Sequence, residues 1–190
     1  MSEPIAIVTA AEAARRLIRP GDILLTAKPS GMLARAILWG QAVGRGEPAN
    51  FKHAMRAAAG GTVISQETSI KQLQLEHWIG EVVRVWSYQG YTDRQRQRLV
   101  EEAALGLGRP YDYLGIFGQL LRAVPLAGGW LSRAVEEPWA TYCSEHVCQV
   151  QRKVDQGFMG KRACQVSPQD LDDWCRQAAG WECMTVRLAA

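Results

Sequence analysis

The sequence has little of several features that mark particular classes of protein. Its net charge is only +3 and its basic residues are dispersed, so it lacks the concentrated basic face that nucleic-acid binding requires. Its most apolar stretch, residues 113–131, is interrupted by Gln119, Arg122, Pro125 and a glycine pair. Such a stretch is too broken to be a transmembrane segment, and we expect it to form a core helix followed by a loop.

Cysteine is also scarce and shows no regular framework. Five cysteines, an odd number without compact spacing, suit a reducing compartment better than an extracellular disulfide scaffold. The first residues lack the basic and apolar regions of the usual secretory signal. We therefore expect a protein that is cytoplasmic as synthesised, and that reaches the cell envelope only through a secretion system or a phage.

The remaining composition is that of a globular protein. With 190 residues, of which 47% are hydrophobic and 22% charged, the chain fits one compact domain over residues 1–190. Apolar periodicity and turn residues predict elements of both kinds. Helices are expected at 10–19, 31–43, 93–108 and 143–155 and from Ser167 onward, and strands at 22–26, 51–67 (a hairpin turning at Gly60 and Gly61), 82–86 and 184–188. This order predicts an α+β fold in which a small antiparallel sheet or barrel packs against helices.

Cys143 is the candidate nucleophile. It follows a loop with Pro138, Trp139 and Tyr142 and begins an expected helix. Amides and the dipole at a helix N-terminus lower the pKa of a thiol, and an imidazole nearby can accept its proton. A free cysteine at a helix start is, however, more often simply a core residue.

The base must come from three histidines, His53, His77 and His146. His146 lies one turn after Cys143 on the same helix, which makes it a poor base because its ring points alongside the thiol. His77 is expected in a peripheral turn or short helix. His53 is the better partner, because a strand presents its ring rigidly to a helix packed across it.

The group that orients this base should come from the strand next to that of His53. Glu67 is the first choice, since a carboxylate holds the tautomer and stabilises the imidazolium. Gln66 is the alternative. Strand alternation places Glu67 on the face of Ser65 and Val63, and Gln66 on the opposite face, and the sequence leaves open which face meets His53.

A metal site is an alternative interpretation, because Cys143, His146 and Cys148 provide metal-binding side chains close together in the sequence. A structural zinc site usually has a second ligand pair at regular spacing, which Cys164 and Cys175 do not supply. We therefore predict neither a metal nor a cofactor.

The order and spacing of several motifs resemble the circularly permuted papain-like cysteine hydrolases of the NlpC superfamily, specifically the YiiX/YaeF-like branch. The resemblance covers about residues 20–171, and it lies in residues 20–24, 51–55, 63–67, 108–112 and 142–147. It implies a permuted papain-like fold with His53 as base, Glu67 as orienting residue and Cys143 as nucleophile, whereas Tyr111 and Asp112 shape the wall of the site. The chain departs from the family pattern at Lys52, Thr68 and His146.

The function expected from the residues and the resemblance is a thiol hydrolase of the peptidase or amidase type. Its partners would be peptide, cell-wall or acyl-amide substrates, such as a peptidoglycan peptide. Two alternatives stay open: a catalytically silent binding or structural module of the same fold, and a thiol acyltransferase or lipid-modifying enzyme.

Overall fold

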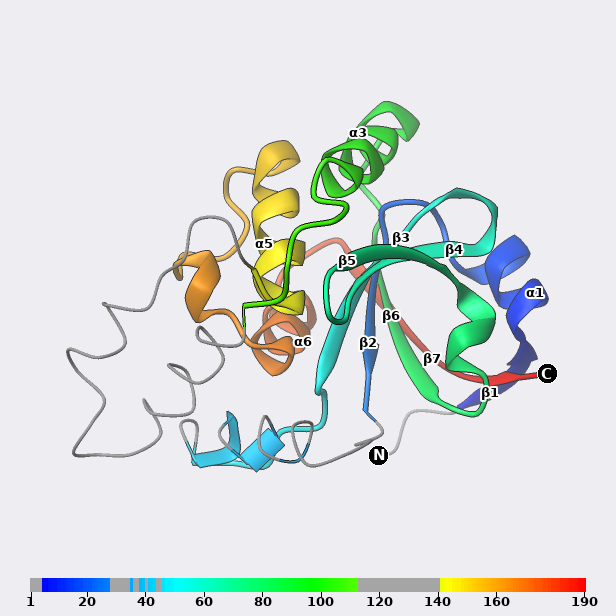
Figure 1. The fold of residues 1–190 in the computed structure, drawn as a ribbon, viewed down its shortest axis with the longest axis horizontal. Helices are drawn as coiled ribbons and strands as arrows, with labels where there is room; N and C mark the ends of the chain where they lie inside the picture. Colours follow the sequence, from blue (N-terminus) through cyan, green and yellow to red (C-terminus); the bar gives the residue numbers. More distant parts are fainter. Residues whose placement is uncertain (1–4, 28–34, 36–37, 40, 44–45, 113–140) are drawn as a thin grey trace.

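Seven strands form one sheet in the computed structural model, which describes residues 5–27, 35, 38–39, 41–43, 46–112 and 141–190 (Figure 1). The strand order is β1-β7-β6-β2-β3-β4-β5, and all neighbours are antiparallel except β1 and β7. The strands are β1 (Ala6–Thr9), β2 (Ile23–Thr26), β3 (His53–Ala57), β4 (Thr62–Gln66), β5 (Ile70–Gln74), β6 (Val82–Tyr88) and β7 (Trp181–Ala189). The predicted α+β class with a mostly antiparallel sheet is confirmed.

Helices cover both faces of this sheet. Figure 1 shows α3, α5 and α6 on one side and α1 on the other. The helices are α1 (Ala10–Glu12), continued by a π-helical turn over Ala13–Leu17, α3 (Asp93–Ala104), α5 (Cys143–Val154) and α6 (Pro168–Gln177). Thr92 and Ser167 cap α3 and α6 with reciprocal side-chain hydrogen bonds. None of the helices that the structure describes is both long enough and apolar enough to cross a bilayer.

Both faces of the central strands are buried. Leu24 of β2 packs into a cluster with Met55 and residues of α1, whereas Ile23 and its neighbour Leu25 face the other way and pack with Val147 of α5. A strand that is covered on both faces needs apolar residues at successive positions. This explains the uninterrupted apolar run of β2.

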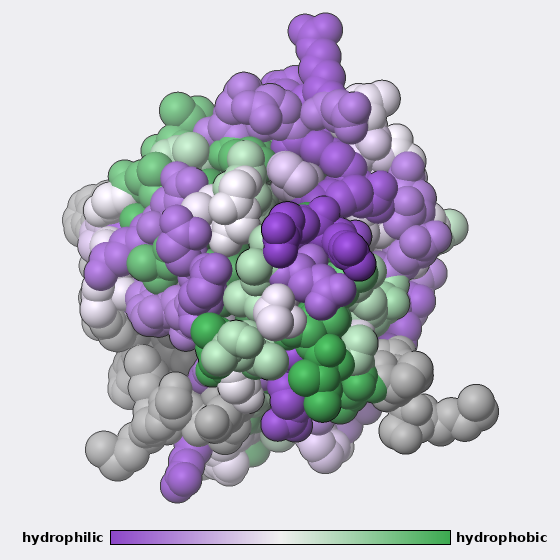
Figure 2. All heavy atoms as spheres, turned by 90° about the vertical axis from the view of Figure 1, so that its right-hand side faces the viewer, coloured by the Kyte–Doolittle hydropathy of each residue, from purple (hydrophilic) through white to green (hydrophobic). Residues whose placement is uncertain are grey.

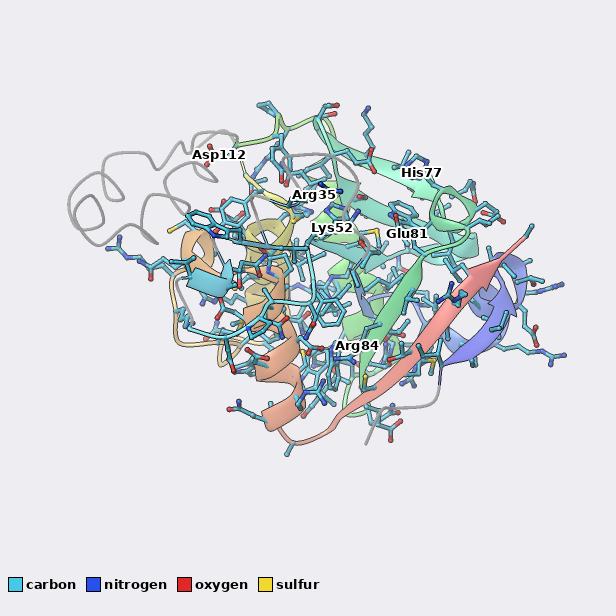
Figure 3. The ribbon with its side chains drawn as sticks, turned by 90° about the horizontal axis from the view of Figure 1, so that it is seen from below. Arg35, Lys52, His77, Glu81, Arg84 and Asp112 are labelled. Atoms are coloured by element: carbon cyan, nitrogen blue, oxygen red, sulfur yellow. The ribbon has the colours of Figure 1, made fainter. Side chains whose placement is uncertain are left out.

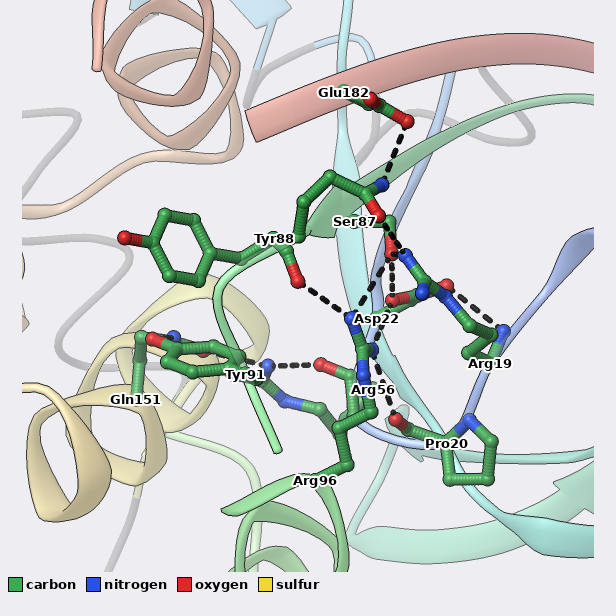
Figure 4. A network of polar contacts seen from close by, with 12 residues as sticks. Arg19, Pro20, Asp22, Arg56, Ser87, Tyr88, Tyr91, Arg96, Gln151 and Glu182 are labelled. Carbon is green, nitrogen blue, oxygen red and sulfur yellow. Dashed lines mark hydrogen bonds and ion pairs between the residues drawn. The ribbon is translucent and has the colours of Figure 1, made fainter. Parts of the chain in front are cut away.

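One buried arginine joins the sheet to α5. Arg56 of β3 is fully buried, and its guanidinium donates to the carbonyl oxygen of Gly21 and to Oε1 of Gln151, both at 2.7 Å. It also donates to the carbonyl oxygen of Val147 at 3.0 Å. Burial lowers the pKa of Arg56 to about 10, so the group stays charged at neutral pH. Figure 4 shows this contact beside the polar network around Asp22.

Two strands were missing from the sequence prediction. β1 is an edge strand whose Ile7 is 72% exposed, so no burial pattern marks it in the sequence. Figure 2 shows the side of the molecule where β1 lies, where hydrophilic residues alternate with hydrophobic ones that gather low on the face and at its upper left. β5 forms the other edge, and only Ile70 within it is buried. His77 lies in a short 3-10 helix, Leu75–Trp78, as predicted. The predicted segment 113–131 and most of 31–43 lie outside the described residues.

Replacing Arg56 by leucine should destabilise the fold strongly. The substitution leaves the carboxamide oxygen of Gln151 and two backbone carbonyls buried without their donor, at a cost of about 3–5 kcal/mol. Urea denaturation measures the change in the free energy of unfolding. Arg98→Leu is the matched control, because the Arg98 side chain is 60% exposed and its Nε lies as far as 4.0 Å from Oε1 of Glu102, which makes a weak ion pair. This substitution should change the free energy of unfolding by less than about 0.5 kcal/mol. Equal effects of the two substitutions would contradict the role of Arg56.

Candidate active site

Cys143 is the first residue of α5 and is 4% exposed. Its sulfur receives hydrogen bonds from the backbone amides of Ala54, Ser144 and Cys143 itself. The pairing of β3 with β4 ends at Met55 and Ser65, so the amide of Ala54 lies just beyond this ladder. The sulfur therefore lies against β3, where the strand leaves its partner.

Burial dominates the acidity of this thiol. Desolvation raises the pKa of Cys143 above its usual value, and the three amide hydrogen bonds oppose the rise without overcoming it. The amides at the helix N-terminus lower this pKa as expected, but the desolvation of the sulfur outweighs them, so the net shift is upward. At neutral pH the resting sulfur is a protonated thiol.

His53 is the first residue of β3 and is half-buried. Its Nε2 lies 2.7 Å from the hydroxyl oxygen of Ser65 on β4. Within the described residues, Nδ1 makes no hydrogen bond. The ring is thus held from one nitrogen, and the other remains available for proton transfer.

The backbone next to His53 lies beside the sulfur of Cys143, since Ala54, whose amide contacts the sulfur, directly follows His53. No hydrogen bond joins the sulfur to the imidazole within the described part of the chain. Burial, and then the charge of Lys52, lower the pKa of His53 to about 4. Both groups are consequently neutral in the resting site.

Three successive side chains at the end of β4 and just after it contact different parts of the protein. Ser65 contacts His53, whereas the carboxylate of Glu67 lies 3.5 Å from Nε2 of His77. Between them, the buried Gln66 donates from Nε2 to the carbonyl oxygens of Thr141 and Pro110, two residues on the loops beside Cys143. The face of Ser65 therefore meets His53, and the structure brings neither Glu67 nor Gln66 to the imidazole.

Sequence reasoning missed Ser65, although a signal was present. Strand alternation had already placed Ser65 on the face of Glu67. The observed register pairs Ser65 with Met55, two residues from His53 on the same face, which sets the hydroxyl diagonally across from the ring. The chain turns after Gln66, where the amide of Glu67 donates to the carbonyl oxygen of Ser69, and this turn directs Glu67 elsewhere.

His146 faces α3 instead of the thiol. A β-carbon added at Gly106 would lie 2.7 Å from Cε1 of His146, so the ring packs tightly against the C-terminal end of α3. Burial, followed by the charges of Arg56 and Arg109, lowers the pKa of His146 to about 4. Cys143 and His146 thus have different neighbours. No three histidine, cysteine, aspartate or glutamate side chains converge on a metal position among the residues that the structure describes.

Tyr111 and Asp112 lie beside the loop that leads to Cys143. Tyr111 forms an isolated parallel bridge with Thr141, and the amide of Asp112 donates to the carbonyl oxygen of Thr141 at 2.9 Å. Asp112 is buried. These contacts place the turn against the residue two positions before the thiol.

A second polar region lies near the start of α6. A cavity of about 270 Å³ is lined there by residues that include Arg84, Gln169, Asp172 and Arg176. Arg84 contacts Asp172 at 2.9 Å, and Arg176 contacts the same carboxylate at 3.2 Å. The described lining holds no cysteine, serine or histidine, so it offers neither a thiol nor a serine hydroxyl as nucleophile.

The lowered histidine pKa values predict a loss of stability in acid. An unfolded histidine titrates near its ordinary value of 6.5, whereas folded His53 and His146 titrate at about 4, so protonation favours unfolding. Stability that is present above pH 6.5 should be lost as the pH falls toward 4. His146→Gln should reduce the loss between pH 7 and 4.5 by about 2–3 kcal/mol, as measured by urea denaturation. His77→Gln, at a side chain 55% exposed, is the control, and an unchanged loss in His146→Gln would contradict the prediction.

Comparison with known proteins identifies a shared fold and no established family. No family model matches the chain, and no curated protein matches it. Among solved structures, the chain is similar to that of the metalloprotein YiiX from Escherichia coli O157:H7. The two are 18% identical, and the alignment covers 87% of this chain and 96% of YiiX with a TM-score of 0.60. The fold of this chain is therefore that of the YiiX structure.

Proposed function

We propose that the chain is a thiol hydrolase, a single domain over residues 1–190 with the permuted papain-like arrangement of the NlpC superfamily. One observation carries the proposal: the sulfur of Cys143, at the N-terminus of α5, lies against the amide that directly follows His53. A nucleophile and a base from distant parts of the chain would then share one site. Cys143 would be the nucleophile and His53 the base.

The chemistry follows from the neutral resting state. The sulfur of Cys143 attacks the carbonyl carbon of an amide or ester while its proton passes to Nδ1 of His53. The imidazolium then gives this proton to the leaving amine or alcohol as the C–N or C–O bond breaks. Water attacks the resulting thioester, transfers a proton through His53 to the sulfur, and releases the acid.

Charge on the carbonyl oxygen would be stabilised by the first-turn amides of α5. These amides already point at the sulfur, so an oxygen bonded to the attacked carbon lies within their reach. Gln66 supports this geometry from β4, because its carboxamide holds Thr141 and Pro110 in place.

The substrate class follows from the resemblance to permuted papain-like hydrolases, whose targets include cell-wall peptides. We therefore take a peptide amide, such as that of a peptidoglycan peptide, as the leading substrate. YiiX is described as a metalloprotein, whereas the described residues of this chain provide no convergent ligand set. No step of the proposed reaction uses a metal.

A second candidate is a binding or structural module that does not turn over substrate. It is favoured by the buried, protonated thiol of Cys143 and the neutral His53, since neither group is poised for reaction in the free protein. The two candidates differ in whether an acyl group is transferred to Cys143.

Acyl transfer to Cys143 tests the hydrolase directly. With p-nitrophenyl acetate, the native protein should release a burst of nitrophenolate and carry an acetyl group on Cys143, identified by peptide mass spectrometry. Cys143→Ala should abolish the burst, and His53→Ala should slow acylation by about 100-fold or more. Cys164→Ala, at a half-buried cysteine, should leave both unchanged. A burst that survives Cys143→Ala, or no acetylation of Cys143 in the native protein, would favour the silent module.

The third member of the site can be resolved by comparing Ser65→Ala with Glu67→Gln. Glu67 was the choice made from sequence, whereas Ser65 contacts the ring. We expect Ser65→Ala to lower kcat/KM for the ester by about 10-fold, and Glu67→Gln to change it by less than about 3-fold, since removing one orienting hydrogen bond costs about 1–1.5 kcal/mol. The reverse order of effects would assign the orienting role to Glu67.

A further inference from the structure

Cys175 and Cys183 are two thiols outside the proposed active site, on consecutive elements of the chain. Cys175 lies in the last turn of α6 and is 1% exposed, whereas Cys183 lies near the start of β7 and is half-buried. Only residues 178–180 connect the two elements. Cys175 belongs to the apolar cluster between α6 and the sheet, and Cys183 packs against the same cluster.

The side chain of Cys183 points toward α6. Cys183 pairs directly with Trp86 of β6, so the two side chains lie on the same face of the sheet. On that face, the indole Nε1 of Trp86 donates to Oδ1 of Asp172 on α6 at 2.8 Å. Arg84 of β6 contacts the same carboxylate at 2.9 Å, and Figure 3 shows Arg84 beside the passage from α6 into β7. α6 therefore lies over the sheet next to Cys183.

The side chain of Cys175 points from α6 toward the sheet. Cys175 follows Asp172 by three residues, which puts both on one face of the helix. Its neighbour Trp174 contacts Trp181 of β7 edge-on, with ring centroids 5.9 Å apart. Trp181 precedes Cys183 by two residues and lies on the same strand face. Contacts on both sides of the pair thus hold the last turn of α6 against the first part of β7.

The two thiols differ in their access to solvent. Cys183 is the more exposed, so a reagent from solvent meets it first. Burial, and then the charge of Asp172, raise the pKa of Cys175 well above its usual value, and a charge on Cys183 adds to the rise. Cys175 is therefore a buried, protonated thiol whose nearest route to reaction is through its neighbour on β7.

We propose that Cys175 and Cys183 form a redox-sensitive disulfide site, in which Cys183 reacts first with a small disulfide from solvent and Cys175 completes the cross-link. The cross-link would join the last turn of α6 to β7 covalently. The inference involves neither Cys143 nor His53, so it is independent of the proposed function.

The reaction is two successive thiol–disulfide exchanges, for which oxidised glutathione is the probe. The thiolate of Cys183 attacks one glutathione sulfur, whose S–S bond breaks and releases the first glutathione thiolate. Cys175 then loses its proton to water and attacks the sulfur of Cys183, and the second glutathione leaves as a thiolate. Two protein thiols are oxidised to one disulfide, and one glutathione disulfide is reduced to two thiols.

Peptide mapping without reducing agent detects the cross-link. Arg176 lies between the two cysteines, so trypsin separates them into peptides 163–176 and 177–187 unless a disulfide joins these peptides. The measurement is made on protein that carries Cys164→Ala, because Cys164 otherwise shares a tryptic peptide with Cys175. After incubation of the folded protein with oxidised glutathione and blocking of the remaining thiols with N-ethylmaleimide, we expect the joined peptides, which a reducing agent should separate.

Single substitutions test the order of the two exchanges. Cys175→Ser should trap glutathione on Cys183 and increase this mixed disulfide about 10-fold or more, because the internal attack that removes it is lost. Cys183→Ser should leave Cys175 without glutathione, since burial keeps the reagent away from it. Cys148→Ser is the matched control, because Cys148 is buried in the same apolar cluster, and it should leave the cross-link unchanged.

Three outcomes would overturn the proposal. The first is glutathione on Cys183 without a cross-link to Cys175, which would mean that the two sulfurs do not meet. The second is a cross-link from Cys183 to Cys148 in place of Cys175. The third is the absence of any modification at both cysteines, which would mean that the folded protein shields Cys183 as well. All three are measured with Cys175 and Cys183 unsubstituted, so they decide even where a substitution at either position prevents folding.

Discussion

The contact between Arg56 and α5 determines where the thiol lies. Arg56 is two residues after Ala54, and Val147, which accepts its hydrogen bond, is one helical turn after Cys143. A fully buried guanidinium needs acceptors within the protein, and its two terminal nitrogens find them in a helix carbonyl, a helix carboxamide and a turn carbonyl. The helix is thereby fixed against β3 at a defined height. The sulfur of Cys143 consequently meets the amide beyond the end of the ladder.

The end of β4 supports both halves of this site. Because side chains alternate along a strand, Ser65 and Gln66 point to opposite faces. Ser65 contacts the imidazole from one face, and Gln66 holds the loops beside the thiol from the other. A single strand end would therefore orient the proposed base and the proposed nucleophile together, without placing a carboxylate on the ring.

Burial determines the protonation states of Cys143 and His53. Desolvation raises the pKa of Cys143 and lowers that of His53, so the free protein holds a thiol and a neutral imidazole in place of an ion pair. If the proposed function holds, such a site forms a reactive thiolate only when a substrate is bound. The charge of Lys52 adds to the lowering of the His53 pKa.

Much of this arrangement was determined by the sequence alone. Local patterns are sufficient to locate most helices and strands, the caps of α3 and α6, and Cys143 at a helix start, because these depend on near neighbours in the chain. They also favoured His53 over His146. The edge strands β1 and β5 escaped prediction, since exposed edges carry little hydrophobic signal. Only the tertiary structure decided that Ser65 is the residue at His53, that Glu67 turns to His77 and that burial keeps the thiol protonated. Register and desolvation depend on how distant segments pack together, and no local pattern encodes them.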